Sequence, residues 1–130
     1  MTVFSKIIAG EIPCYKVAED EENFAFLDIE PLTEGHTLVV PKMEVDKIYD
    51  LPAERLSSLM MLAQKVAKKL DQVIECKRVA MVVIGLDVHH VHIHLIPLVN
   101  GAKDIDFTNP KMQYTKEEME EIARKVYVEL

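Results

Sequence analysis

The chain has no tryptophan, only two cysteines and four glycines, and no long apolar run in its 130 residues. Cys14 and Cys76 lie far apart without a CxxC spacing, which is typical of reduced thiols rather than of a disulfide framework. No stretch approaches the ~18 apolar residues that a membrane-spanning helix needs. The N-terminal segment carries Lys6 and Glu11 within its short apolar stretch and so lacks the core of a signal peptide. We therefore expect a cytoplasmic protein with no membrane contact.

Positive charge is scarce as well, because 15 lysines and arginines stand against 22 acidic residues and give a net charge of −7. This balance argues against binding to a nucleic acid polymer, since such binding depends on Lys and Arg neutralising phosphates. It does not exclude one small nucleotide, which a few aimed donors can hold. A hydrophobic fraction of 49% argues against disorder, and the length suits one core, so we predict a single domain over residues 1–130.

The apolar patterns predict five strands and three helices without a repeat or a long linker. Because the strands mostly follow one another and the helices lie outside them, the predicted fold class is α+β, an antiparallel sheet with helices packed on it. The expected elements are a short helix over 2–10, strands over 15–19, 23–28 and 34–41, a long helix over 50–73, strands over 79–84 and 90–98, and a C-terminal helix after a capping box at 115–118.

The long helix carries the clearest local signals. Asp50 is predicted as its N-cap and Pro52 as a residue of its first turn. Met60, Met61 and Leu62 widen its apolar arc, which fits either a contact with another subunit or a deeply buried helix. Six apolar residues recur at helical spacing and should face the sheet: Leu56, Leu59, Ala63, Val66, Leu70 and Val73.

Four of the five histidines stand within residues 89–97, HHVHIHLIP. Side chains alternate between the two faces of a strand, so His90, His92 and His94 share one face and the apolar residues between them share the other. Three imidazoles opposite a buried face require a polar cleft above the sheet. This row is therefore the candidate site, whereas His89, which lies in or beside the preceding turn, is assigned no part in it.

Two chemistries suit the histidine row. Two of its imidazoles could bind a metal ion such as zinc, together with His36 or Asp87. However, the first and third histidines are ~13 Å apart along the backbone, which is far for one ion. Neutral imidazole is also a nucleophile, and its ordinary pKa of ~6.5 leaves it mostly uncharged at neutral pH. The spacing favours nucleophilic or acid–base chemistry over a metal centre.

The stretch His90-Val-His-Ile-His-Leu-Ile resembles the signature of the histidine-triad nucleotide hydrolases and transferases. FSKIIAGEIP at residues 4–13 and FAFLDIEPLTEGHTLVVPK at residues 24–42 resemble the Hint branch of that family. The resemblance implies a five-stranded antiparallel sheet with one long helix, a C-terminal helix and a short N-terminal helix. It also implies a homodimer whose sheets join, and a hydrolase that acts on a purine nucleoside monophosphate unit, as a phosphoramidate or an ester, without a cofactor.

The same resemblance implies roles for four histidines. His92 matches the nucleophile that attacks the α-phosphorus and forms a nucleotidyl-histidine intermediate. His94 matches the neighbour that contacts the phosphate and the leaving group. His90 matches the position that orients the nucleophile, and His36 matches a fourth histidine behind the row.

Substrate-binding residues are implied in the same way. Asp28 and Ile29 match a ribose-binding pair, and a carboxylate suits this task because it accepts hydrogen bonds from both ribose hydroxyls. The apolar walls around the base would come from Phe26, Leu27 and Ile12.

The segment before the histidine row departs from the family pattern. Leu86 and Asp87 stand where Hint relatives carry a glutamine and a hydroxyl that help to hold the leaving group and the phosphate. In the substrate-binding region, Asp87 would repel a phosphate unless it is protonated, bridged by a cation or turned away. Two alternatives to the enzyme follow: a catalytically weak nucleotide-binding regulator, and a zinc-binding protein. The zinc alternative loses support because Thr2 and Ser5 stand where metal-carrying relatives have cysteines.

Overall fold

The computed structural model describes all residues, 1–130, and the order of its main elements agrees with the prediction. Most boundaries lie within a few residues of those expected. In chain order the elements are α1 (Val3–Ile8), β1 (Lys16–Glu19), β2 (Asn23–Leu27), β3 (Thr37–Pro41), the 3₁₀ turn η1 (Ile48–Asp50), α2 (Ala53–Val73), β4 (Arg78–Val82), β5 (Ile93–Leu98), the 3₁₀ turn η2 (Ala102–Ile105) and α3 (Lys116–Val126).

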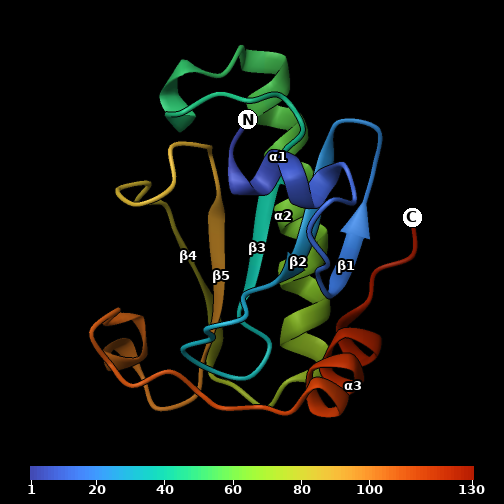
Figure 1. Cartoon of the computed structure of the whole chain (residues 1–130). Helices are drawn as coiled ribbons and strands as arrows, with labels where there is room; N and C mark the ends of the chain where they lie inside the picture. Colours follow the sequence, from blue (N-terminus) through green and yellow to red (C-terminus); the bar gives the residue numbers. More distant parts are fainter.

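One sheet holds all five strands in the order β1-β2-β3-β5-β4, and every neighbouring pair is antiparallel. The strand that carries His94, β5, is internal because it lies between β3 and β4. Strands β1 and β4 form the two edges of the sheet (Figure 1). The predicted α+β class with a five-stranded antiparallel sheet is confirmed.

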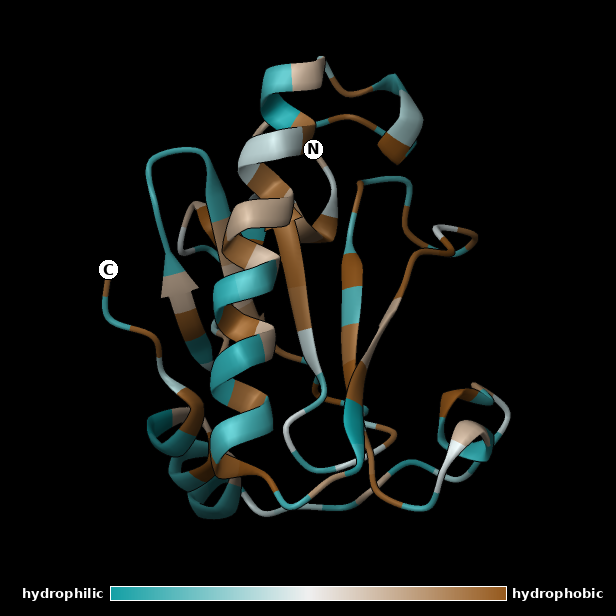
Figure 2. Ribbon diagram, turned by 180° about the vertical axis from the view of Figure 1, so that it is seen from behind, coloured by the Kyte–Doolittle hydropathy of each residue, from teal (hydrophilic) through white to brown (hydrophobic).

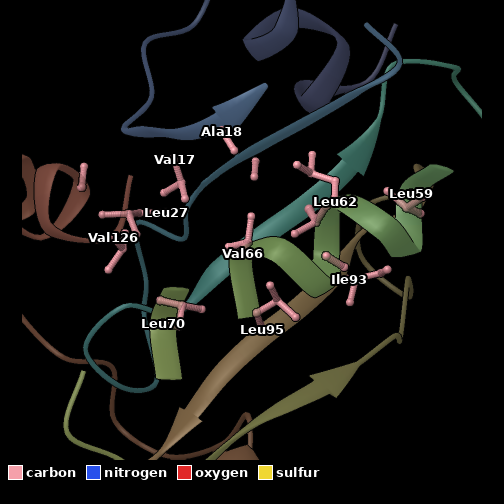
Figure 3. Close-up of a cluster of buried hydrophobic side chains, with 14 of the residues drawn as sticks. Val17, Ala18, Leu27, Leu59, Leu62, Val66, Leu70, Ile93, Leu95 and Val126 are labelled. Carbon is pink, nitrogen blue, oxygen red and sulfur yellow. The ribbon is translucent and has the colours of Figure 1, made fainter. Parts of the chain in front are cut away.

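The helices lie on both faces of this sheet. Helix α2 covers one face and α1 lies against the other (Figure 1, Figure 2). The main core fills the space between the sheet, α2 and α3, and Figure 3 shows side chains from the strands and from α2 meeting there. Leu59, Val66 and Leu70 of α2 have no exposed surface. Burial of this apolar layer fixes the sheet from one side and leaves its other face available for polar groups.

The structure corrects the predicted start of α2. Pro52 occupies the N-cap position, where it makes no side-chain bond, and Asp50 ends the turn η1 instead of capping the helix. Leu51 between them is extended, with φ of −69° and ψ of 141°, so Asp50 lies outside the first helical turn.

Met60, Met61 and Leu62, which widen the apolar arc of α2, do not share one environment. Leu62 is 1% exposed and belongs to the main core. Met60 and Met61 are exposed, so only these two residues extend the arc beyond the core. At 21 residues α2 is the longest helix, and neither it nor any shorter helix combines the length and the hydropathy of a membrane span.

The predicted histidine strand is shorter than expected. The ladder of β5 begins at Ile93 rather than at His90, because the Val91 N–H bonds to the Val45 carbonyl oxygen outside the sheet, at 2.8 Å. The alternation of side chains nevertheless continues upstream of the ladder. Val91 enters the main core, whereas the rings of His90 and His92 contact α1 on the other face.

Strand β3 also starts later than predicted, at Thr37. Gly35 just before it has a φ of +86°, in the left-handed region that favours glycine. A Cβ atom at this position would lie 3.2 Å from side-chain atoms of both Leu70 and Ile74. The end of α2 therefore fixes the turn that presents His36 at the start of β3.

A smaller apolar cluster lies beneath α1, on the face opposite the main core. Thr2 caps α1 by accepting a hydrogen bond from the Ser5 N–H at 3.1 Å. Phe4 is buried and packs edge-on against Phe26, with ring centroids 5.7 Å apart. The members of the cluster are Phe4, Phe24, Phe26, Leu38 and Val40.

The C-terminal helix α3 forms as the sequence predicts. Both bonds of the capping box are present, since Thr115 accepts from the Glu118 N–H and Glu118 accepts from the Thr115 N–H. Its apolar stripe is buried and consists of Met119, Ile122, Ala123 and Val126.

The division of α2 into a buried and an exposed side generates a first prediction. Leu59→Ala should lower the free energy of unfolding by about 2–5 kcal/mol, because it removes a fully buried side chain and leaves a cavity. Met61→Ala on the exposed side should change it by less than about 0.5 kcal/mol. Urea unfolding followed by circular dichroism measures both values, and equal losses would contradict the described packing.

Candidate functional site

The α1 face of the sheet contains a cavity of about 720 Å³, a size typical of small-molecule sites. Its walls come from α1 and the turn after it, the end of β2, the turn between β4 and β5, and the segment that follows β5. Most of this lining is apolar, with a few polar side chains among it. Such a surface suits a ligand that is partly apolar and partly charged.

The cavity brings together all but one of the predicted site residues. The exception is His90, which has no exposed surface and lies outside the lining. Leu27 borders the cavity, but it also belongs to the main core, so it adds little to an apolar wall. The predicted residues that line the cavity are His36, His92, His94, Asp28, Ile29, Phe26, Leu27, Ile12 and Asp87.

A hydrogen bond to the backbone fixes the tautomer of His92. Its Nδ1 lies 2.7 Å from the carbonyl oxygen of His90. A carbonyl oxygen only accepts, so Nδ1 carries the proton and Nε2 of the neutral ring keeps its lone pair. Burial lowers the pKa of His92, against a smaller opposing effect of this hydrogen bond. His92 thus presents an unprotonated nitrogen at neutral pH.

His36 and His94 form a chain in which each proton can be assigned. The Leu32 N–H donates to His36 Nδ1 at 3.0 Å, so the proton of the neutral His36 ring is on Nε2. That Nε2 lies 3.0 Å from His94 Nδ1, which therefore accepts, and the proton of His94 is on its own Nε2. Burial is the main cause that lowers the pKa of His36 to about 3 and the pKa of His94 to about 4. Both rings are neutral at neutral pH.

Asp28 lies at the end of β2 with one carboxylate oxygen accepting the Glu30 N–H at 2.9 Å. Burial raises the pKa of Asp28, and the hydrogen bond from the Glu30 N–H opposes this effect, with a smaller contribution from the positive charge of Lys111. The other carboxylate oxygen is 3.6 Å from His36 Nε2, but this contact is not an ion pair because His36 is neutral. Ile29 follows with 73% of its surface exposed.

Two further residues line the cavity that no sequence pattern predicts, Phe107 and Lys111. The Phe107 ring centroid lies 4.9 Å from that of His94 and 6.3 Å from that of His36. Lys111 donates from Nζ to the carbonyl oxygens of Phe107, at 2.6 Å, and of Asn109, at 3.1 Å. It is the only lysine or arginine that lines the cavity. No periodic pattern marks this segment, so sequence reasoning had no signal to use.

The two residues that depart from the family pattern also line the cavity. Leu86 is 79% exposed, and Asp87 is exposed beside it. Solvent screens an exposed carboxylate, so the repulsion between Asp87 and a bound phosphate is weaker than it would be in a closed site.

Asp28, His36 and His94 are the cavity side chains that could hold a metal ion, since one donor atom of each lies within 4.8 Å of the others. Only one member of the histidine row belongs to this group. A ligating nitrogen must be free of its proton, yet His36 Nε2 carries one and shares it with His94 Nδ1. A metal ion on His36 Nε2 would require the ring proton to move to Nδ1. That move would break the hydrogen bond that Nδ1 accepts from the Leu32 N–H. The hydrogen bonds therefore favour acid–base and nucleophilic chemistry.

The buried neutral histidines make stability depend on pH. Unfolded histidine titrates near pH ~6.5, far above the values of His36 and His94 in the folded chain. Between these values the unfolded state binds more protons, so the free energy of unfolding falls as the pH is lowered from ~6.5 toward 4. Between about pH 7 and about pH 4.5, the free energy of unfolding of His36→Asn should fall by about 3 kcal/mol less than that of the wild type. Urea unfolding at several pH values measures this difference. The matched control is His89→Asn at an exposed histidine, which should follow the wild type; an unchanged pH dependence in His36→Asn would contradict the assignment.

Known proteins resemble this chain in sequence and in fold. The family model "HIT domain" matches residues 9–101, which include all five histidines. The chain is 42% identical over 97 residues to the adenosine 5'-monophosphoramidase of Saccharomyces cerevisiae, an alignment that covers 73% of this chain and 61% of the yeast protein. It is 35% identical over 133 residues to the adenosine 5'-monophosphoramidase of Schizosaccharomyces pombe, with 95% and 97% covered. The match thus spans less than two thirds of the first relative and nearly all of the second.

A solved structure extends the likeness to three dimensions. The crystal structure of a Hit-like protein involved in cell-cycle regulation from Bartonella henselae superposes with a TM-score of 0.83. It is 31% identical in sequence, and the superposition covers 96% of this chain and 92% of that one. With a family model over most of its length and relatives of this similarity, the chain belongs to the HIT, or histidine-triad, family.

Proposed function

We propose that the protein cleaves a purine nucleoside 5′-phosphoramidate or ester through a nucleotidyl intermediate on His92. The observation that carries this proposal is the bond from His92 Nδ1–H to the His90 carbonyl oxygen, because it leaves Nε2 unprotonated in a cavity of nucleotide size. Family membership and the relatives named adenosine 5'-monophosphoramidase support a nucleotide hydrolase activity.

In the first step the lone pair of His92 Nε2 attacks the α-phosphorus and a nitrogen–phosphorus bond forms. The bond from phosphorus to the leaving group breaks, and its electron pair departs with that group. His94 is neutral and holds its proton on Nε2, so it assists as a hydrogen-bond donor to the phosphate or the leaving atom. The departing amine or alcohol takes its proton from water.

In the second step water attacks the phosphorus of the intermediate. The nitrogen–phosphorus bond breaks, its electron pair returns to His92 Nε2, and the nucleoside monophosphate is released. The attacking water loses one proton, which balances the proton taken up by the leaving group. A different acceptor in place of water would give transfer instead of hydrolysis.

The rest of the cavity suits the nucleoside. Phe26 and Ile12 supply apolar surface for a purine, and Asp28 supplies acceptors for two ribose hydroxyls. Burial raises the pKa of Asp28, while the hydrogen bond from the Glu30 N–H, and to a smaller extent the charge of Lys111, favour the ionised carboxylate that performs this task best.

A nucleotide-binding regulator with little turnover is the second candidate. The observation that favours it is the pair Leu86 and Asp87 on the cavity lining, where relatives have hydrogen-bond donors. Removal of one aimed donor slows an enzyme by about 10²–10³. Binding of AMP without any product from an AMP phosphoramidate after long incubation would favour this candidate over the enzyme.

The intermediate can be trapped directly. Acid-quenched wild-type protein, taken during reaction with adenosine 5′-phosphoramidate, should carry the mass of one adenylyl group on the peptide that contains His92. His92→Asn should carry no such mass and should lose at least about a thousandfold in turnover, because the nucleophile is missing. Peptide mass spectrometry and product chromatography measure the two effects.

His89→Asn is the matched control, because it removes an exposed neighbouring histidine. We expect it to retain both the adduct and the turnover of the wild type. Undiminished turnover in His92→Asn would refute the assignment of the nucleophile.

We also propose that two copies pair through the edge strand β4. An edge strand presents unpaired backbone groups and can extend its sheet with a second copy. Met81 of β4, and Val83 and Ile84 just beyond it, are exposed. Exposed Met60 and Met61 lie on α2, which covers one face of the same sheet.

Met81→Lys should convert the proposed dimer to a monomer, because it places a charge in the apolar contact. Met112→Lys is a control with the same substitution at the same exposure, since both methionines are 45% exposed. Sedimentation velocity measures the mass of each variant. A monomeric wild type, or equal effects of the two substitutions, would contradict pairing through β4.

A further inference from the structure

We propose that Thr2 is a positioning residue for the nucleophile, acting through His90. This inference rests on the proposed nucleophilic role of His92. The Thr2 hydroxyl oxygen lies 2.7 Å from His90 Nδ1, although the two residues are 88 positions apart in the sequence. Thr2 does not line the cavity, so it acts without contacting the substrate.

His90 needs two partners because its ring is completely buried. Its Nε2 lies 2.9 Å from the Pro41 carbonyl oxygen, which only accepts, so Nε2 carries a proton. In the neutral ring Nδ1 then holds a lone pair that requires a donor. The Thr2 hydroxyl is that donor, and it selects the Nε2–H tautomer of His90.

The groups around Thr2 leave its hydroxyl proton free for this bond. The Ser5 N–H donates to the Thr2 hydroxyl oxygen at 3.1 Å, as the cap of α1. The Ser5 hydroxyl lies 3.2 Å from the Thr2 hydroxyl but gives its own proton to Glu44 at 2.6 Å. Glu44 also accepts the Thr2 N–H, at 3.3 Å. We call Thr2, Ser5, Glu44 and His90 the Thr2 clasp.

Two contacts connect the Thr2 clasp with His92, the proposed nucleophile. The carbonyl oxygen of His90 accepts the Nδ1–H of His92 at 2.7 Å, so displacement of His90 disturbs the bond that sets the reactive nitrogen. Phe4 of α1 packs edge-on against both rings, with centroids 5.7 Å from His90 and 5.0 Å from His92. One hydroxyl therefore caps α1 and also orders the two histidines that α1 covers.

The test uses the full chain with three substitutions at one position. Thr2→Val keeps the shape of the side chain but removes the hydroxyl, Thr2→Ser keeps the hydroxyl, and Thr2→Asp keeps a helix cap but offers no donor. Long-range ¹H–¹⁵N NMR reports which ring nitrogens of His90 are protonated. Steady-state kinetics with adenosine 5′-phosphoramidate report kcat and KM separately.

In the wild type and in Thr2→Ser, His90 should show the Nε2–H tautomer alone. Thr2→Val should show mixed tautomers and should lower kcat by about ten- to a hundredfold, with KM changed by less than about threefold, because the nucleophile is misplaced while the binding walls remain. Thr2→Asp should protonate both nitrogens of His90, because its carboxylate accepts where threonine donates. It therefore keeps the proposal testable if Thr2→Val does not fold.

Thr115→Val is the matched control, because it removes the hydroxyl that caps α3, far from the histidines in sequence and outside the cavity lining. It should leave kcat and the His90 spectrum unchanged. An unchanged His90 tautomer in Thr2→Val or Thr2→Asp, or a kcat that Thr2→Ser does not restore, would overturn the role of Thr2. If the wild type forms no adduct on His92, the proposed function fails, but the spectra of the Thr2 variants still decide whether the Thr2 clasp orders His90.

Discussion

The chemistry proposed for the cavity depends on one hydrogen bond, from His92 Nδ1–H to the carbonyl oxygen of His90. That carbonyl is available because the ladder of β5 begins only at Ile93. A regular strand through His90 would commit its backbone groups to the neighbouring strand. The chain thus joins the sheet only after His92, which leaves the His90 carbonyl oxygen to accept the His92 Nδ1–H, while the alternation of side chains keeps Val91 in the core.

Burial determines the charge state of the site. No fully buried side-chain nitrogen or oxygen lacks a hydrogen-bond partner, so the buried ring atoms of the histidines are satisfied without being ionised. The pKa values of His36, His92 and His94 are all lowered, chiefly by burial. The cavity therefore offers neutral imidazoles and a single lysine, beside the carboxylates of Asp28, Glu30 and Asp87, rather than a cluster of cations. The uncharged imidazole that results is the form in which histidine acts as a nucleophile.

The sequence predicts the parts of this molecule that depend on local pattern. Alternation separates the core face of the histidine segment from its reactive face, and the capping box locates α3. The start of α2 is misplaced because the extended Leu51 depends on packing and not on a local signal. Phe107 and Lys111 are brought to the cavity by a segment tied back through the Met112 N–H to the Pro31 carbonyl oxygen, at 2.8 Å, and such a long-range bond leaves no periodic trace. The alternation of side chains predicts the same place for all three histidines of the row. His90 instead bonds to the Thr2 hydroxyl and the Pro41 carbonyl oxygen and does not line the cavity.

The tight turn at Gly35 connects the packing of the end of α2 with the histidines of the cavity. Its backbone lies against the last turns of α2, where a Cβ atom would come within 3.2 Å of the side chains of Leu70 and Ile74. The next residue, His36, holds the ring that fixes the proton of His94. A bulkier side chain at Leu70 or Ile74 would therefore press on the backbone that leads into His36, so the packing of α2 and the proposed chemistry of the cavity depend on the same contact.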